Sequence, residues 1–104
     1  MIVSIDFSIF IRSGGSFGHV AGRLELDAAP SVGDTVSFTT PRDAAIAKPH
    51  AFVGLLTVEE RVFDAANRAP LALMLEDLYF DSEEAAREVI PYLEGGFGLA
   101  VQVH

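Results

Sequence analysis

Residues 3–12 alternate between apolar and polar side chains except at Phe10, and this alternation strongly limits what the start of the chain can form. The apolar side chains on one parity are Val3, Ile5, Phe7, Ile9 and Ile11. Successive side chains of a strand point to opposite faces of a sheet, whereas a helical face repeats every three or four residues. We therefore predict a strand with one buried face at the start of the chain.

Further strands are predicted along most of the chain, separated by turn residues. After a glycine-rich reversal at 13–18, the segments that read as strands are residues 19–27, 35–39, 52–63, 71–80 and 99–103. Residues 71–80 are apolar on both parities, which is typical of a central strand covered by another layer. The longest irregular stretch is residues 40–51, with a proline near each end.

One helix is expected, between the last two strands. Ser82 is a suitable N-terminal cap. The apolar residues that follow have helical spacing and are Ala86, Val89, Ile90 and Leu93. Pro91 is expected to kink or end the helix near Ile90, and Gly95-Gly96 to end it in any case. The predicted fold is α+β and mainly antiparallel β, with five or six strands in a curled sheet or small barrel.

Composition narrows the classes of function. The chain of 104 residues is expected to form a single domain, 1–104. It has no cysteine, which excludes disulfides and thiolate zinc sites. With a net charge of −8 and only seven basic residues, we expect no nucleic-acid partner. No apolar run approaches the roughly 20 residues of a membrane span, so we expect no membrane crossing and a cytoplasmic location.

Motifs for catalysis or metal binding are weak. Residues 14–18, GGSFG, match the G-x-S-x-G pattern, but a strand pattern follows where a nucleophile elbow requires a helix. The three histidines, His19, His50 and His104, share no ligand spacing, and Asp81-Ser82-Glu83 lacks the remainder of a calcium loop. We predict no catalytic residue, metal or cofactor. If the chain has a ligand pocket, its polar groups are expected in the 40–51 loop, at Arg42, Asp43 and His50.

Acidic residues concentrate in the second half of the chain. Residues 52–104 hold ten acidic and three basic residues, and residues 76–88 alone hold six acidic ones. The helix dipole and capping explain those at the helix start. If 52–63 and 71–80 pair as a hairpin, Glu59 or Glu60 would approach Glu76 or Asp77, and opposed like charges destabilise a sheet. Such a face is a candidate for binding a basic protein.

The first functional hypothesis is therefore a small non-enzymatic binding protein, such as an immunity or inhibitor protein that neutralises a basic partner. The residues expected to bind that partner are Glu59, Glu60, Glu76, Asp77, Asp81, Glu83, Glu84 and Glu88. Two alternatives remain open. One is a structural or homo-oligomeric subunit, because half of the residues are hydrophobic. The other is a small-molecule-binding or enzymatic domain with a pocket near residues 40–51.

Overall fold

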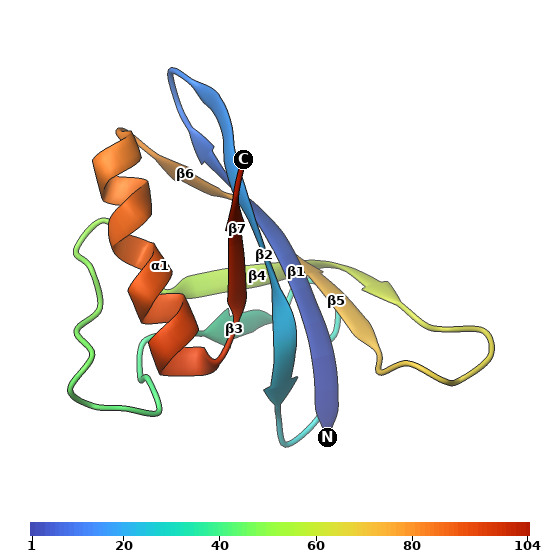
Figure 1. Cartoon of the computed structure of the whole chain (residues 1–104). Coiled ribbons are helices and arrows are strands. Elements are labelled where there is room, and N and C mark those ends of the chain that lie inside the picture. Colours follow the sequence, from blue (N-terminus) through green and yellow to red (C-terminus); the bar gives the residue numbers. More distant parts are fainter.

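The alternating first segment forms the central strand of a mixed sheet, and one helix packs on one face of that sheet (Figure 1). The computed structural model describes residues 1–104. Its strands are β1 (Ile2–Ile11), β2 (Gly15–Glu25), β3 (Thr35–Ser37), β4 (Leu55–Val62), β5 (Ala72–Leu75), β6 (Leu78–Phe80) and β7 (Ala100–Val103). The helix, α1 (Glu83–Phe97), lies between β6 and β7.

The strands follow the order β3-β4-β5-β1-β2-β7, and β6 also pairs with β1. Most neighbours are antiparallel, but β5 and β6 run parallel to β1. The sheet is open, with β3 and β7 at its edges. The α+β class and the position of the helix before the last strand are thus confirmed. The sheet has seven strands and does not close into a barrel.

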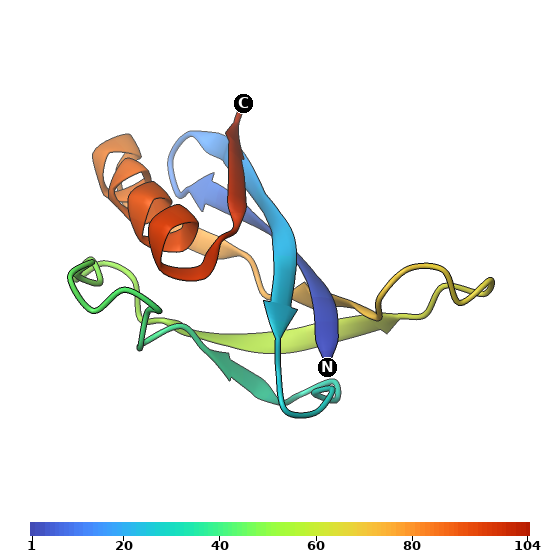
Figure 2. The ribbon, with the colours of Figure 1, turned by 60° about the horizontal axis from the view of Figure 1, so that its bottom comes forward.

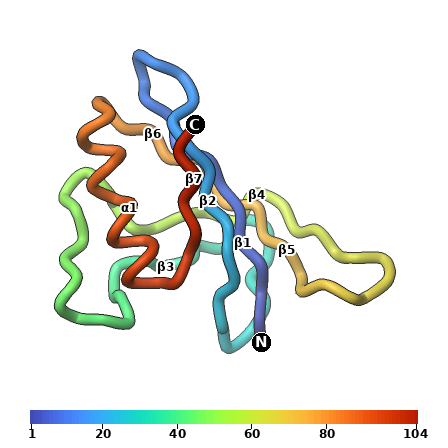
Figure 3. Tube along the Cα trace, viewed as in Figure 1, coloured from blue at the N-terminus to red at the C-terminus, as the bar shows by residue number.

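The chain termini lie at opposite ends of the β1–β2 hairpin (Figure 3). The C-terminal strand β7 runs beside β2, and the amide of His104 donates to the carbonyl of Phe17 over 3.0 Å. The connection between β4 and β5 extends away from the helix on the other side of the sheet, as Figure 2 shows. Here Asp64 accepts backbone hydrogen bonds from Arg68, Ala69 and Ala66, which lower the pKa of its carboxyl group.

The segment 71–80 is two strands instead of the single central strand predicted. Asp6 pairs with Met74 and Ile9 with Leu78, so two residues of β1 face three residues on the other strand. The extra residue is accommodated at Glu76-Asp77, between β5 and β6. A bulge of this kind interrupts the ladder and bends the strand. The hydrophobic pattern does not reveal it because apolar residues continue on both sides.

The predicted cap is confirmed: the Ser82 hydroxyl accepts from the amide of Ala85 over 3.1 Å. The predicted end near Ile90 is wrong, since α1 continues through Pro91 to Phe97. Proline removes one hydrogen bond and costs about 3 kcal/mol in a helix. Burying Tyr92, Leu93 and Phe97 recovers about 1.5–3 kcal/mol per side chain, which outweighs that cost.

Gly95 and Gly96 do not end the helix, which stops instead at Gly98, a left-handed cap with φ 70°. Their small size lets the 40–51 loop approach α1 closely. A Cβ on Gly96 would lie 2.9 Å from Cβ of Pro41, and one on Gly95 would lie 2.7 Å from Cδ1 of Ile46. The amide of Arg42 donates to the carbonyl of Gly96 over 3.0 Å.

Aromatic side chains join α1 to the sheet. The ring of Phe38 packs at 5.1 Å from that of Phe97, and the ring of Tyr92 lies 5.9 Å from that of Phe52. The Tyr92 hydroxyl donates to the backbone carbonyl of Phe38. All four side chains are buried, and burial raises the pKa of Tyr92 above its ordinary value of 10.0.

We expect Gly95→Ala and Gly96→Ala to change stability in opposite directions. Alanine favours a helix by up to about 1 kcal/mol over glycine, and the flexible end of Ile46 can move away from a methyl group at residue 95. The Pro41 ring cannot move without the loop, so Gly96→Ala should lower the free energy of unfolding by about 1–3 kcal/mol. Urea denaturation measures both. Equal stability of the two variants would contradict the close loop packing.

The raised pKa of Tyr92 predicts a loss of stability in alkali. The buried phenol is neutral, so its stabilisation is complete below about pH 10 and is lost as the pH rises through the raised pKa. Tyr92→Phe should cost about 1–3 kcal/mol at neutral pH, because the Phe38 carbonyl loses its donor. Its stability should then fall less steeply above pH 10 than that of the wild type. Parallel alkaline slopes would refute this account.

Candidate functional site

Glu76 and Asp77 use their carboxylates to bind backbone amides at the bulge. An Oε1 atom of Glu76 accepts from the amide of Thr57 over 2.8 Å, and Oδ1 of Asp77 accepts from the amide of Ser8 over 2.9 Å. Both side chains therefore replace carbonyl acceptors where the ladder is interrupted. A regular ladder would have provided those acceptors from the backbone.

The expected opposition of acidic side chains across the β4–β5 hairpin does not occur. Val58 pairs with Leu75, and after a second irregularity Glu60 pairs with Met74. Glu59 occupies that irregularity. The register therefore avoids the repulsion that we expected of Glu59 or Glu60 with Glu76 or Asp77. The acidic residues of β4 thus give no evidence for a binding face there.

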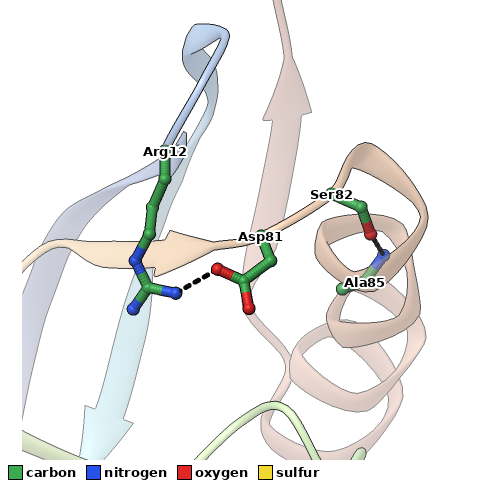
Figure 4. A network of polar contacts seen from close by, with 4 residues as sticks. All are labelled: Arg12, Asp81, Ser82 and Ala85. Atoms are coloured by element: carbon green, nitrogen blue, oxygen red, sulfur yellow. Dashed lines mark hydrogen bonds and ion pairs between the residues drawn. The ribbon is translucent and has the colours of Figure 1, made fainter.

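Two further acidic residues form ion pairs near the start of α1. Asp81 pairs with Arg12 of the β1–β2 hairpin, next to the Ser82 cap (Figure 4). Glu83 accepts from Nε and Nη2 of Arg87, at 3.0 and 2.7 Å, in an i, i+4 pair. The Arg87 guanidinium also lies 5.4 Å from the centre of the Phe17 ring. These exposed contacts contribute about 0–1 kcal/mol each and organise the surface around the helix start.

The side chains of the remaining predicted partner-binding residues make no hydrogen bond or ion pair, and all are exposed: Glu59, Glu60, Glu84 and Glu88. They belong to two separate surfaces. Glu60 pairs with Met74 on the face of the sheet away from α1, whereas Glu84 and Glu88 lie one turn apart on the outer side of α1. The sequence had predicted these residues as binding a single partner without assigning them to a common face.

The residues of the 40–51 loop do not gather around a cavity. Oδ1 of Asp43 accepts from the amide of Ala45 over 3.0 Å, and the backbone of Arg42 bonds to α1. The His50 side chain is exposed. None of these three residues lines any of the three surface clefts. Lys48 closes the loop by donating to the carbonyl of Phe52.

Two Ser–His contacts occur that the sequence analysis did not predict. On the open face of the sheet, Nε2 of His19 lies 2.7 Å from Asp6, and Nδ1 lies 3.4 Å from the Ser8 hydroxyl. The hairpin register places Ser8 opposite His19. Asp6 and His19 are each 38% exposed, and none of the three lines a cleft. Acyl transfer also requires donors aimed at an oxyanion, and the amide of Ser8 is already bonded to the carboxylate of Asp77.

The serine of the G-x-S-x-G pattern makes the second contact. The Ser16 hydroxyl lies 2.8 Å from Nδ1 of His104, beside a cleft of about 260 Å³ that Arg87 also lines. Ser16 lies within β2 and not at a strand-to-helix turn, so it lacks the strained, exposed geometry of a nucleophile elbow. No group of three or more His, Cys, Asp or Glu side chains is placed to hold a metal ion.

A recess with mostly hydrophobic lining residues lies between the start of β4 and β6. This cleft, here called the β4–β6 cleft, has a volume of about 320 Å³ and is lined by Arg12, residues 51–56 and residues 76–80. The cleft begins where the 40–51 loop ends. Arg42, Asp43 and His50, which were predicted to line a pocket, lie outside it. A recess of about 330 Å³ lies beside Met1 and Phe63.

Comparison with protein-family models, curated protein sequences and solved structures gave no match to this chain. The single helix, α1, is too short and too polar to cross a membrane.

Amide variants of Glu76 and Asp77 remove the negative charge but keep an oxygen that can accept the strand hydrogen bonds. They therefore separate the effect of the hydrogen bond from the effect of the charge. Gln at Glu76 and Asn at Asp77 keep an oxygen acceptor, so E76Q and D77N should lower the free energy of unfolding less than the alanine variants do. E76A and D77A each leave a strand amide without its acceptor and should cost about 0.5–1.5 kcal/mol. Chemical denaturation tests this. An alanine variant as stable as its amide counterpart would show that the bond contributes nothing.

Proposed function

We propose that this protein is a small acidic, non-enzymatic binding protein that engages a basic protein partner, in the manner of an immunity or inhibitor protein. The observation that carries the proposal is the outer face of α1. There Glu84 and Glu88 are exposed, lie one helical turn apart and have no cationic partner. The single base of the helix, Arg87, is already bound to Glu83.

This arrangement is unfavourable for the isolated helix. Like charges at i and i+4 destabilise a helix by about 0.2–0.5 kcal/mol. The helix dipole favours Glu84 in the first turn, but its influence fades before Glu88. A charge that weakens the folded chain is better explained by an interaction outside it. A basic surface docked on α1 would relieve the repulsion and gain from the surrounding negative potential.

The other acidic residues support the proposal at longer range. Residues 81–97 contain five acidic residues and one basic residue, and the whole chain carries −8. Such a field speeds the approach of a basic protein, and its effect weakens with salt because the Debye length falls from about 10 Å at 0.1 M to 3 Å at 1 M. Four acidic side chains add to this negative charge although they also form hydrogen bonds or ion pairs within the fold: Glu76, Asp77, Asp81 and Glu83.

The same charge disfavours the alternative of a homo-oligomeric subunit, because two copies of −8 repel each other. The alternative of a ligand pocket at Arg42, Asp43 and His50 gains no support from a cavity. Neither alternative is favoured by a specific observation as strong as the unpartnered pair on α1.

Charge reversal at Glu88 should stabilise the protein and weaken partner binding together. Glu88→Lys replaces repulsion from Glu84 with an i, i+4 attraction, so the free energy of unfolding should rise by about 0.4–1 kcal/mol. In pull-downs from the source organism's lysate, the wild type should recover a stoichiometric basic protein at low salt. Glu84→Lys/Glu88→Lys should recover at least about tenfold less, a change of about 1.4 kcal/mol.

The matched control is Glu59→Lys/Glu60→Lys, which changes the net charge by the same amount on the other face of the sheet. It should retain most of the partner. Equal recovery by the wild type and the α1 variant, or recovery that is insensitive to salt, would contradict the proposal.

A further inference from the structure

The β4–β6 cleft forms because two strands separate at the bulge. β4 pairs with β5 only from Val58 onward, and earlier residues of β4 stay with β3. β6 follows β1 instead of β4. Two hydrogen bonds join the strands where they begin to separate. The amide of Thr57 donates to Oε1 of Glu76 over 2.8 Å, and the amide of Glu76 donates to the carbonyl of Thr57 over 2.9 Å.

Both strands present an unpaired backbone edge to this cleft. The amide of Arg12 donates to the carbonyl of Phe80, so Phe80 and Leu78 direct their backbone groups toward β1, and Tyr79 directs its groups away. On β4, Leu56 and Val58 face β3, so Leu55 faces the cleft. Val53 makes no backbone hydrogen bond. Free strand edges are templates for another extended chain.

The side chains at the cleft add an apolar surface with an acidic rim. Val53, Leu55 and Tyr79 are 73, 48 and 54% exposed, which is unusually high for neighbouring large apolar side chains. The ring of Tyr79 is held by stacking on Phe10 at 5.3 Å. Asp77 is exposed at the rim, and the charge of Arg12 is balanced by Asp81. Most lining residues are therefore hydrophobic, and the charged ones leave the cleft net negative.

We propose that the β4–β6 cleft binds an extended, basic segment of another protein, which pairs with the free edges at Leu55 and Tyr79. A five-residue segment spans about 17 Å and has alternate side chains on each face. Apolar side chains would cover Leu55 and Tyr79, and lysine or arginine would lie near Asp77. Recognition through main-chain hydrogen bonds with side-chain selectivity is the usual form of strand addition.

Two other occupants fit less well. A small molecule requires a site that encloses most of its surface, whereas the lining here is open to solvent. A second copy of this chain would bring another charge of −8 to an acidic rim. The recess near Met1 and Phe63 offers apolar surface too, but its strand edges are paired, with Met1 bonded to Leu26 and Ser4 to Leu71.

The test uses a capped five-residue peptide in which lysine and valine alternate, with amide NMR as the readout. It should bind saturably, shift the amides of Val53, Leu55 and Tyr79, and slow hydrogen exchange at Leu55 and Tyr79. A peptide with glutamate in place of lysine should bind at least about tenfold more weakly, and so should a lysine peptide with N-methylated valines. The N-methyl peptide leaves the protein unchanged, so folding does not affect that comparison.

Val53→Lys/Leu55→Lys should weaken the lysine peptide about tenfold or more. The matched control, Val62→Lys/Phe63→Lys, places the same charges on exposed apolar residues at the far end of β4 and should have little effect. Shifts confined to α1, equal binding of the lysine and glutamate peptides, or no saturable binding would overturn the proposal. None of these results bears on the α1 face, which is tested separately with the basic partner.

Discussion

The register step at Glu76-Asp77 is the constraint on which the rest of the sheet depends. β1 is ten residues long, and the bulge lets β5 and β6 pair with it in succession. β4 pairs with β5 but not with β6, and its first residues pair only with β3. The two carboxylates stabilise this branching because they supply acceptors to Thr57 and Ser8, whose amides lose their ladder partners.

The inner side of the branched sheet is then covered by a helix and a loop acting together. α1 brings Tyr92 and Phe97 against Phe38 and Phe52, and the Tyr92 hydroxyl bonds to the end of β3. The 40–51 loop rests on the glycines of the helix. The loop thus covers part of the core through Ile46, while the polar side chains of Arg42, Asp43 and His50 stay exposed. The acidic residues are left to the outer surface.

The features that were predictable from sequence are those with a local cause. Alternation in residues 3–11 and the Ser82 cap are visible within a few residues, and both were confirmed. The break at Glu76-Asp77 depends on the register against β1, about 70 residues away. The two carboxylates interrupt an apolar run, but this local sign does not reveal the register. The helix end predicted at Pro91 and at Gly95-Gly96 was wrong. The tendency of proline and glycine to end a helix was outweighed by the burial of the side chains that follow and by the contact of the glycines with the loop. The candidate residues Glu84 and Glu88 were predicted, but the cleft required knowledge of two strand pairings.

The parallel pairing of β1 with β5 and β6 also affects how the chain folds. Ser4 pairs with Ala72 and Ile11 with Phe80, so one edge of the central strand pairs only with residues about 70 positions further along the chain. The antiparallel β1–β2 hairpin forms locally and much earlier. Contacts of such long sequence separation slow the rate-limiting step, which places folding in the range of about milliseconds to seconds. Until then, the second edge of β1 stays unpaired in the partly folded chain.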